Sequence, residues 1–292
     1  MAEVTNTVRI DAIPPAEMAE RAENVGVNKA NLSFLTMCGL AILAGAFIGL
    51  GAIFMTTVTT GTKDVPFGLA RLAGGLVFSL GLILVIVAGA ELFTGNNLII
   101  MAFMDGKVTL AKLLRNWGIV YLGNLVGSIA TAIIMFLSKQ YTFSGGALGL
   151  NALTIANNKS GLNFIPAVAL GIMCNALVCL AVWLCFSARS NTDKILSIVF
   201  PITAFVACGF EHSVANMYFI PIGLLIKWFD PAFVDTMKAT VPNLTFANFL
   251  FRNLLPVTIG NIIGGAGLVG LVYWSIYLRP KGLRQAASSG KK

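Results

Sequence analysis

The sequence predicts an all-α membrane protein of two inverted three-helix repeats, with its second and fifth helices broken at mid-membrane. The composition is the first reason: the 292 residues are 57% hydrophobic and only 11% charged, with a mean hydropathy of +0.84. Soluble domains carry about 25% charged residues. Two apolar runs are longer than one span requires. Finally, polar motifs of matching spacing lie within these two runs.

Six apolar runs are long enough to span a bilayer. They cover residues 35–58, 66–104, 117–137, 164–187, 195–226 and 254–278. The run 66–104 would measure about 58 Å as one helix, against about 30 Å of hydrocarbon. It contains no charged hairpin, so we expect a helix broken at Thr94-Gly95-Asn96-Asn97. The run 195–226 is also too long, and Gly209 to Asn216 lie at its centre.

The segment before the first span predicts a short surface helix. Pro15 suits the first helical position, and Met18, Ala22 and Val25 would share one apolar stripe. We interpret residues 1–33 as a cytoplasmic segment that anchors at the interface, or else plugs the pore mouth. No apolar run typical of a cleaved signal peptide occurs in it. Residues 34–278 would form the membrane domain, and residues 279–292 a basic cytoplasmic tail.

Positive charge predicts the topology. The two terminal segments and the connections between spans two and three and between spans four and five together hold thirteen Lys and Arg. The other three connections hold seven. Both termini are therefore expected in the cytoplasm of a multi-pass plasma-membrane protein. The net charge of +8 does not indicate nucleic acid binding, because the basic residues lie at helix ends. Five cysteines without a CxxC pair and a single histidine predict no metal site, and no cofactor motif is present.

Two pairs of motifs predict the repeat. Glu91 precedes Asn96 by five positions, as Glu211 precedes Asn216. Gly123-Asn124-Leu125-Val126-Gly127-Ser128 also resembles Gly260-Asn261-Ile262-Ile263-Gly264-Gly265. Three spans in each half would give the halves opposite topology, and matched interruptions indicate a binding or conduction site between them.

The polar residues at bilayer depth are the candidate site. Ionisable groups there usually face a pathway or a partner. His212 could offer a hydrogen bond or a proton to an anion in transit, and the Thr94 hydroxyl suits a filter facing it. Glu211 would be either protonated or paired with a cation, for which Lys159 is a candidate. The proposed polar network comprises Lys159, Glu211, Asn216 and Asn175. The alternative is that these groups only join helices.

Buried amides and apolar residues complete the prediction. Asn124 and Asn261 are expected to bond the exposed backbone of the broken helices. Apolar side chains would form constrictions that an anion crosses at high cost and a neutral acid crosses easily. The candidates are Phe78, Leu82, Leu92 and Phe205. Plain core packing is the alternative for these four residues.

At these residues the chain resembles the formate/nitrite transporter family, and most of all its formate channels. The resemblance covers roughly residues 14–278. The most specific stretch is Gly209-Phe210-Glu211-His212-Ser213-Val214-Ala215-Asn216-Met217. Further matching stretches are PFGLARLAGGLVFSLGLIL from Pro66, ELFT from Glu91, NWGIVYLGNLVG from Asn116, NALVCLAVW from Asn175 and PVTIGNIIGG from Pro256.

The resemblance implies an aquaporin-like fold and a homopentamer with one pore in each protomer. It implies that Thr94 and His212 form the central site, and it associates the N-terminal helix with pH gating. The Asn-Pro-Ala motifs of aquaporins are absent. Gly95-Asn96-Asn97 departs from the Ser/Thr-rich residues often found there in formate channels, which leaves formate, nitrite and hydrosulfide open as substrates.

The sequence thus predicts a channel for small monovalent anions, foremost formate, with passage that is passive or proton-coupled through His212. A nitrite or hydrosulfide channel of the same family is the first alternative. A membrane enzyme using Glu211 and His212 is the second, although no nucleophile, metal set or cofactor motif accompanies them. A purely structural scaffold is the third, and it fits poorly with two broken, polar-centred helices.

Overall fold

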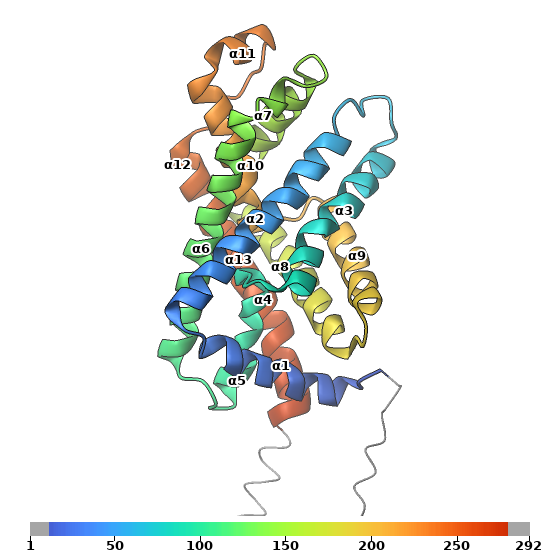
Figure 1. Cartoon of the computed structure of the whole chain (residues 1–292), viewed down its shortest axis with the longest axis vertical. Helices are drawn as coiled ribbons and strands as arrows, with labels where there is room; N and C mark the ends of the chain where they lie inside the picture. Colours follow the sequence, from blue (N-terminus) through green and yellow to red (C-terminus); the bar gives the residue numbers. More distant parts are fainter. Residues whose placement is uncertain (1–11, 280–292) are drawn as a thin grey trace, which may run out of the picture.

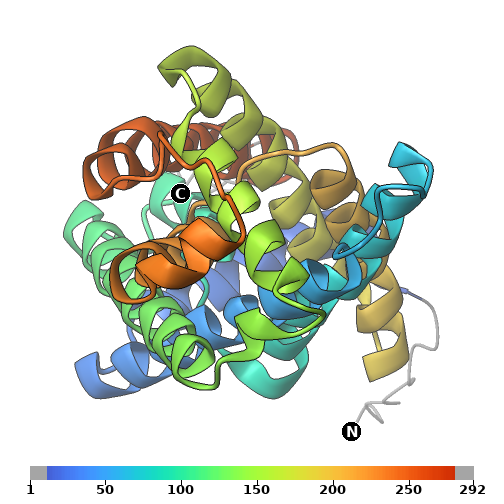
Figure 2. The same cartoon turned by 90° about the horizontal axis from the view of Figure 1, so that it is seen from above.

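The computed structural model describes residues 12–279 and is helical throughout its ordered elements, with no strand among the described residues. Residues 1–11 and 280–292, which include the whole predicted basic tail except Arg279, lie outside the described range. Figure 1 shows α1 (Pro15–Ala30) and α5 (Ile100–Met104) at one end, and α7 (Ala147–Ser160) and α11 (Pro231–Thr236) at the other. Viewed from above, helices of both halves intermix around one interior (Figure 2).

Five helical stretches of the described residues are long and apolar enough to cross a bilayer. They are Phe34–Val58, Phe67–Gly89, Leu110–Leu137, Phe164–Ser187 and Phe246–Leu278. The first, third and fourth are α2, α6 and α8. The second joins α3 (Phe67–Ile83) to the π-helical η1 (Leu84–Gly89). The fifth runs through α12 (Phe246–Asn248), η4 (Phe249–Leu254), α13 (Leu255–Ile262), η5 (Ile263–Leu271) and η6 (Trp274–Leu278).

The predicted fifth span is two helices in the structure. α9 (Asn191–Ala207) and α10 (Ser213–Phe229) have 17 residues each, and such a helix measures about 25 Å, less than the hydrocarbon core. Gly209 between them has φ +77°, a left-handed conformation that favours glycine. The interruption falls within the predicted region, and Gly209 and Phe210 line a cavity, where irregular backbone at this depth is tolerated.

The break in the first half was predicted at the wrong residues. It follows Gly89, whose φ is +85°, and Ala90 and Leu92 are extended. Thr94 and Gly95 lie instead within the short helix α4 (Phe93–Asn96), which continues through η2 (Asn97–Ile99) into α5. The expected break covered Thr94-Gly95-Asn96-Asn97, whereas Gly89 holds the positive φ that a side chain would strain. Figure 1 places α4 at mid-height.

The two halves contain corresponding elements in the same order. α1 and α7 each end in a lysine-bearing last turn and each precede a long span, and they lie at opposite ends of the molecule (Figure 1). Helix pairs approach closely at the predicted glycines, since a Cβ at Gly127 would meet the Ile42 carbonyl and one at Gly264 would meet the Ile172 carbonyl. This close approach agrees with the role of small residues in membrane helix packing.

The helix α1 is an integral part of the first repeat. Met18 and Ala22 of its predicted apolar stripe are buried, and they pack in a cluster with Leu98, Trp183 and Leu278. Val25 lines a cavity instead. The helix therefore covers the end of the bundle as a packed element, and its position matches that of α7 in the other half.

Candidate functional site

The two halves meet at a hydrogen bond between Thr94 and His212. Thr94 Oγ1 lies 2.9 Å from His212 Nε2, and both residues are at most 2% exposed. His212 is the N-cap of α10, and its Nδ1 accepts a hydrogen bond from the Ala215 N–H at 3.0 Å. A neutral imidazole with an acceptor at Nδ1 carries its proton on Nε2. The Nε2–H therefore donates to Thr94.

A small apolar cavity of about 10 Å³ borders this pair. Its lining comprises Ile48, Phe78, Leu82, Leu92, Val178, Ile202, Phe205 and His212. The four predicted constriction residues are all in this lining, and each is at most 3% exposed. A space of this size holds about one water molecule. An unpaired anion would find no polar partner here except the imidazole.

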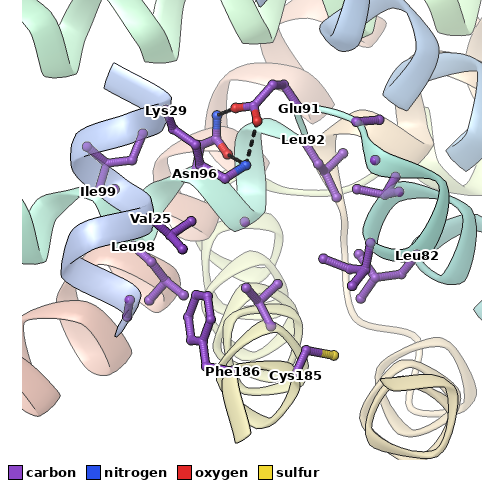
Figure 3. Close-up of a pocket in the computed structure, with 18 of the residues that line it drawn as sticks. Val25, Lys29, Leu82, Glu91, Leu92, Asn96, Leu98, Ile99, Cys185 and Phe186 are labelled. Atoms are coloured by element: carbon purple, nitrogen blue, oxygen red, sulfur yellow. Dashed lines mark hydrogen bonds and ion pairs between the residues drawn. The ribbon is translucent and has the colours of Figure 1, made fainter. Parts of the chain in front are cut away.

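A larger cavity of about 390 Å³ opens toward the α1 end of the molecule, and we call it the inner vestibule. It shares Leu82 and Leu92 with the small cavity. Figure 3 shows Val25 and Lys29 of α1 on one side of this space and Leu82 on the other. Lys29 and Glu91 place charge in its wall, so a solute in the vestibule meets polar groups before the two leucines.

A cavity of about 230 Å³, the outer vestibule, opens toward the α7 end. It shares Phe78, Phe205 and His212 with the small cavity. Lys159 and Glu211 lie in its wall. The three cavities thus succeed one another across the molecule, with leucines between the first pair and phenylalanines between the second pair.

The predicted polar network lies in the wall of the outer vestibule, with one change of membership. Lys159 Nζ lies 2.8 Å from Glu211 Oε1, and Asn216 donates to Glu211 Oε2 at 2.6 Å. Asn253, which the sequence reading missed, donates to the Lys159 carbonyl at 3.0 Å, and its Oδ1 accepts from Asn216 at 2.7 Å. Asn175 is elsewhere: its amide donates to Thr94 O, Asn97 Oδ1 and Asn261 O.

Asn175 was wrongly placed because its depth in the fourth span gives no information about which half it faces. Its three acceptors are two backbone carbonyls and one side-chain amide. The contact with the Thr94 carbonyl holds the short helix α4 beside α8. Asn175, on α8 of the second half, therefore joins the first-half residues Thr94 and Asn97 to Asn261 and bonds neither Lys159 nor Glu211.

A second network with the same chemistry lies in the wall of the inner vestibule. Lys29 Nζ contacts Glu91 Oε1 at 2.7 Å and Asn96 Oδ1 at 3.0 Å. Asn96 donates to Glu91 Oε2 at 2.7 Å and to Asn116 Oδ1 at 2.9 Å, and Asn116 donates to the Lys29 carbonyl at 3.1 Å. Figure 3 shows the Lys29, Glu91 and Asn96 contacts.

The sequence contains signals for the three residues that were missed. Asn116 precedes Asn124 by eight positions, as Asn253 precedes Asn261. Lys29 lies in Asn28-Lys29-Ala30-Asn31-Leu32, which resembles Asn158-Lys159-Ser160-Gly161-Leu162. Comparing the two halves over these stretches would have paired Lys29 with Lys159.

Asn124 and Asn261 make hydrogen bonds to the backbone around the two interruptions. Asn124 accepts from the Phe93 N–H at 2.9 Å and donates to the Ala41 and Glu91 carbonyls. In the other half, Asn261 accepts from the Ser213 N–H at 3.0 Å and donates to the Gly171 and Glu211 carbonyls. Each amide satisfies backbone groups that a continuous helix would have bonded internally.

No group of three or more potential metal ligands occurs among residues 12–279. The charged cluster outside the membrane lies where α1 meets the loop after α5. Glu23 is 2% exposed, and its Oε2 lies 2.7 Å from Lys107 Nζ. Burial raises the pKa of Glu23, Lys107 opposes this shift, and neighbouring Asp105 adds to it. The bond to Glu23 raises the pKa of Lys107.

Comparison with known proteins places this geometry in a family. The chain is 50% identical to the formate channel FocA of Escherichia coli K12 over 273 residues, which cover 92% of this chain and 96% of that protein. It is 43% identical to the formate channel FocA of Haemophilus influenzae, covering 89% of this chain and 93% of that one. A solved pentameric formate channel with formate bound superposes with a TM-score of 0.80 at 49% identity, covering 84% of this chain and 98% of that one.

The family assignment rests on most of the chain. The model of the formate/nitrite transporter family matches residues 16–275, which include both networks and the Thr94–His212 pair. The membrane-spanning helices and these relatives identify an integral plasma-membrane protein. The chain belongs to the formate/nitrite transporter family.

Proposed function

We propose that the protein is a channel for small monovalent anions, with formate as its principal substrate. The observation that carries the proposal is the hydrogen bond of 2.9 Å between Thr94 and His212 in an apolar cavity between two lysine-bearing vestibules. The formate-channel relatives and the solved structure with formate bound support the choice of substrate. One pathway passes through each protomer of a homopentamer, which the pentameric relative supports.

The vestibules attract the anion and the constrictions select against its charge. Lys29 and Lys159 raise the local anion concentration at the two mouths, because a positive cleft focuses counter-ions. The leucine and phenylalanine constrictions offer an anion no hydrogen bond, and moving an unpaired charge there is costly. His212 supplies the one N–H donor at the centre, where an arriving formate accepts the bond that Thr94 holds in its absence.

Proton transfer through His212 requires the ring to change partners. Nδ1 accepts from the Ala215 N–H, so the charged ring, which needs a proton on both nitrogens, cannot keep this contact. A rotation that frees Nδ1 would let the ring take a proton from one vestibule and give it to formate. This step would make passage proton-coupled and would carry neutral formic acid across the apolar constrictions.

The first prediction tests this function with the purified protein in liposomes that contain a pH dye. Wild-type vesicles should take up formate, with proton movement at a fixed ratio to formate. In His212→Asn, the fold should persist and formate-dependent proton movement should fall to the level of empty vesicles. An unaltered proton-to-formate ratio in this variant would contradict the relay, and no formate flux in the wild type would contradict the substrate.

A nitrite or hydrosulfide channel is the second candidate, because Gly95-Asn96-Asn97 follows Thr94 in this chain. Competition in the same vesicles separates the substrates. Fast nitrite or hydrosulfide flux with little formate flux would retain the pathway and change the substrate. The hypothesis of a membrane enzyme is dropped, because the family comprises transporters.

We also propose that both termini lie in the cytoplasm. The excess of Lys and Arg on that side of the predicted topology supports this orientation. It assigns the inner vestibule and α1 to the cytoplasmic face, and α7 and α11 to the outside. Labelling of single introduced cysteines at Asp64 and Asp105 by an impermeant reagent, in a cysteine-free background, should modify only Asp64→Cys from outside intact cells.

A further inference from the structure

Arg71 is a second cation in the wall of the outer vestibule. It belongs to the second turn of α3 and is half-buried. It also lines a neighbouring cavity of about 430 Å³, which we call the outer side cavity. The two cavities share Met55, Arg71, Ile155 and Val206 in their walls. Of these four residues Arg71 alone is charged, so it places a cation where the two spaces meet.

One edge of the Arg71 guanidinium is held by the backbone at the interruption between α9 and α10. Nε donates to the Ala207 carbonyl at 2.9 Å, and Nη2 donates to the Val206 carbonyl at 2.7 Å. Gly209 permits this approach, because a Cβ there would lie 2.9 Å from Nη2. Carbonyls in the last turn of a helix lack partners within the helix. These contacts therefore fix the guanidinium without neutralising its charge.

The other edge of the guanidinium is available to a ligand. Arginine has five N–H donors, and two of them make the contacts with α9. Within residues 12–279, no carboxylate pairs with Arg71 and its Nη1 makes no hydrogen bond. Lys159, in the same vestibule, is instead paired with Glu211 at 2.8 Å. The uncompensated positive charge of the outer vestibule is therefore that of Arg71.

The outer side cavity suits an anion that approaches Arg71. Thr59, Thr62 and Asn151 add hydroxyl and amide groups to its wall, and no acidic residue is among the described residues that line it. The Phe67 ring centroid lies 5.9 Å from Arg71 Cζ, a contact that favours a planar cation in this place. Two parallel N–H groups of a guanidinium match the two oxygens of a carboxylate. A positive cleft of this kind concentrates small anions.

We propose that Arg71 is an anion-binding residue of the outer entrance, whose free edge takes a small carboxylate from the outer side cavity and passes it to Lys159. The transfer exchanges hydrogen bonds and forms no covalent bond. Because Lys159 is already paired with Glu211, the anion is held less tightly as it nears the apolar constriction. The inference rests on the proposed anion-channel function, and it adds to that function the site where the anion first binds.

The test measures the half-saturating formate concentration for uptake into right-side-out and inverted membrane vesicles. At about 0.01 M ionic strength, where the Debye length is about 30 Å, Arg71→Gln should raise this concentration about tenfold in right-side-out vesicles. This is the low end of the range for electrostatic focusing. Arg71→Lys retains the charge and should stay closer to the wild type. At about 0.15 M the difference between Arg71→Gln and wild type should shrink, whereas loss of the contacts with α9 alone would give the same difference at both ionic strengths.

A second measurement uses the wild type and does not depend on the folding of a variant. An arginine-specific dicarbonyl reagent that does not cross membranes is applied to both kinds of vesicle, and modification of Arg71 is followed by mass spectrometry of peptides. Modification should be slower in formate than in the same concentration of gluconate, because formate occupies the free edge and the bulkier gluconate does not. Equal rates in the two anions would overturn the proposal.

Lys238→Gln is the matched control. Lys238 follows α11 at the same end of the molecule, is exposed, and lines neither the outer vestibule nor the outer side cavity. Its removal should leave the half-saturating concentration near the wild-type value. An equal rise in Lys238→Gln would mean that only the net charge of this face matters and would overturn the proposal, as would an unchanged value for Arg71→Gln in both vesicle orientations. A wild type without formate uptake would instead overturn the proposed substrate, and the same comparison with nitrite would then decide the role of Arg71.

Discussion

The inner and outer halves have the same polar framework but different apolar and aromatic residues around it. Each has a lysine, a glutamate and two asparagines at matching contacts. Leu82 and Leu92 line both the inner vestibule and the small cavity, whereas Phe78 and Phe205 line both the small cavity and the outer vestibule. Leu92 and His212 follow the equivalent glutamates. The repeat therefore builds the walls of both vestibules, and the departures from the repeat give the centre the His212 imidazole and the outer side two phenylalanine rings.

The largest expected effect comes from removing either lysine. Lys29→Met and Lys159→Met each leave a buried carboxylate without its cation, which costs about 3–5 kcal/mol. We expect the larger loss for Lys159→Met, because its side chain is 17% exposed against 28% for Lys29, so water compensates less. Thermal unfolding in detergent, followed by tryptophan fluorescence, measures both losses.

The control for the lysine variants removes the stranded charge. Lys159→Met combined with Glu211→Gln should recover most of the lost stability, since the amide still bonds Asn216 and Asn253. Equal losses in the single and double variants would indicate that packing of the lysine chain, rather than its charge, stabilises the outer half. A larger loss of stability for Lys29→Met than for Lys159→Met would contradict the expected order of the two halves.

The two breaks provide the next comparison. Gly89 and Gly209 occupy equivalent positions and both have positive φ, so alanine should cost about 1–2 kcal/mol at each. The cost should be larger at Gly209, because a Cβ there would lie 2.9 Å from Arg71 Nη2, whereas Gly89 faces open space. Gly95→Ala should instead stabilise by up to about 1 kcal/mol, since Gly95 is helical.

The same thermal unfolding experiment distinguishes these glycines. A destabilising Gly95→Ala with a neutral Gly89→Ala would place the break at Thr94–Asn97, where the apolar run alone had suggested it. The expected opposite signs would place the break two residues before Glu91. The glycine variants therefore test the element that orients Leu92 and His212 toward the pathway.

Local pattern and internal repetition were enough to predict much of the fold. Run lengths indicated the spans and the need for breaks, and the Glu–Asn spacing indicated the repeat that relates Glu91 and Asn96 to Glu211 and Asn216. Three-dimensional contacts decided the rest. Lys29 lies 62 residues from Glu91 in the sequence. Its position at a helix end is typical of a lysine that only sets the orientation of a membrane protein. For Asn175, the burial was predicted correctly but the hydrogen-bond partners were not.

The position of the first break was missed for a different reason. Gly89 lies between Ala88 and Ala90, whereas Gly95 lies between the polar residues Thr94 and Asn96, so the polar neighbours indicated a break at the helical glycine and not at the glycine with positive φ. Comparing halves resolves the ambiguity, since Gly209 precedes Glu211 by two positions and Gly89 precedes Glu91 by two. The repeat thus contains more positional information than either run alone.

The smallest expected effect concerns how α1 and α7 are held in place. Glu23 of α1 and Leu153 of α7 stand six residues before the equivalent lysines, and both are buried. Glu23 Oε1 has no hydrogen-bond partner, so an ionised carboxylate is poorly satisfied, and burial raises its pKa. When the pKa of a carboxyl is higher in the folded state than in the unfolded state, where it is about 4.5, the carboxyl stabilises the fold at pH values below the unfolded-state pKa. This contribution is lost as the pH rises through the folded-state pKa.

Glu23→Gln removes this titration, so the difference in Tm between wild type and variant should change with pH. The wild type should gain relative to Glu23→Gln as pH falls from 7 to 5, because protonation relieves the buried charge of the docked helix. Each kcal/mol corresponds to about 2–4 °C in a chain of this size. Asp235→Asn removes an exposed carboxylate on the outer face and should show no such trend. A difference in Tm that stays constant or shrinks toward pH 5 would mean that the ion pair with Lys107 contributes more than the burial of Glu23. The packing of α1 would then be as independent of pH as the packing of α7 through Leu153.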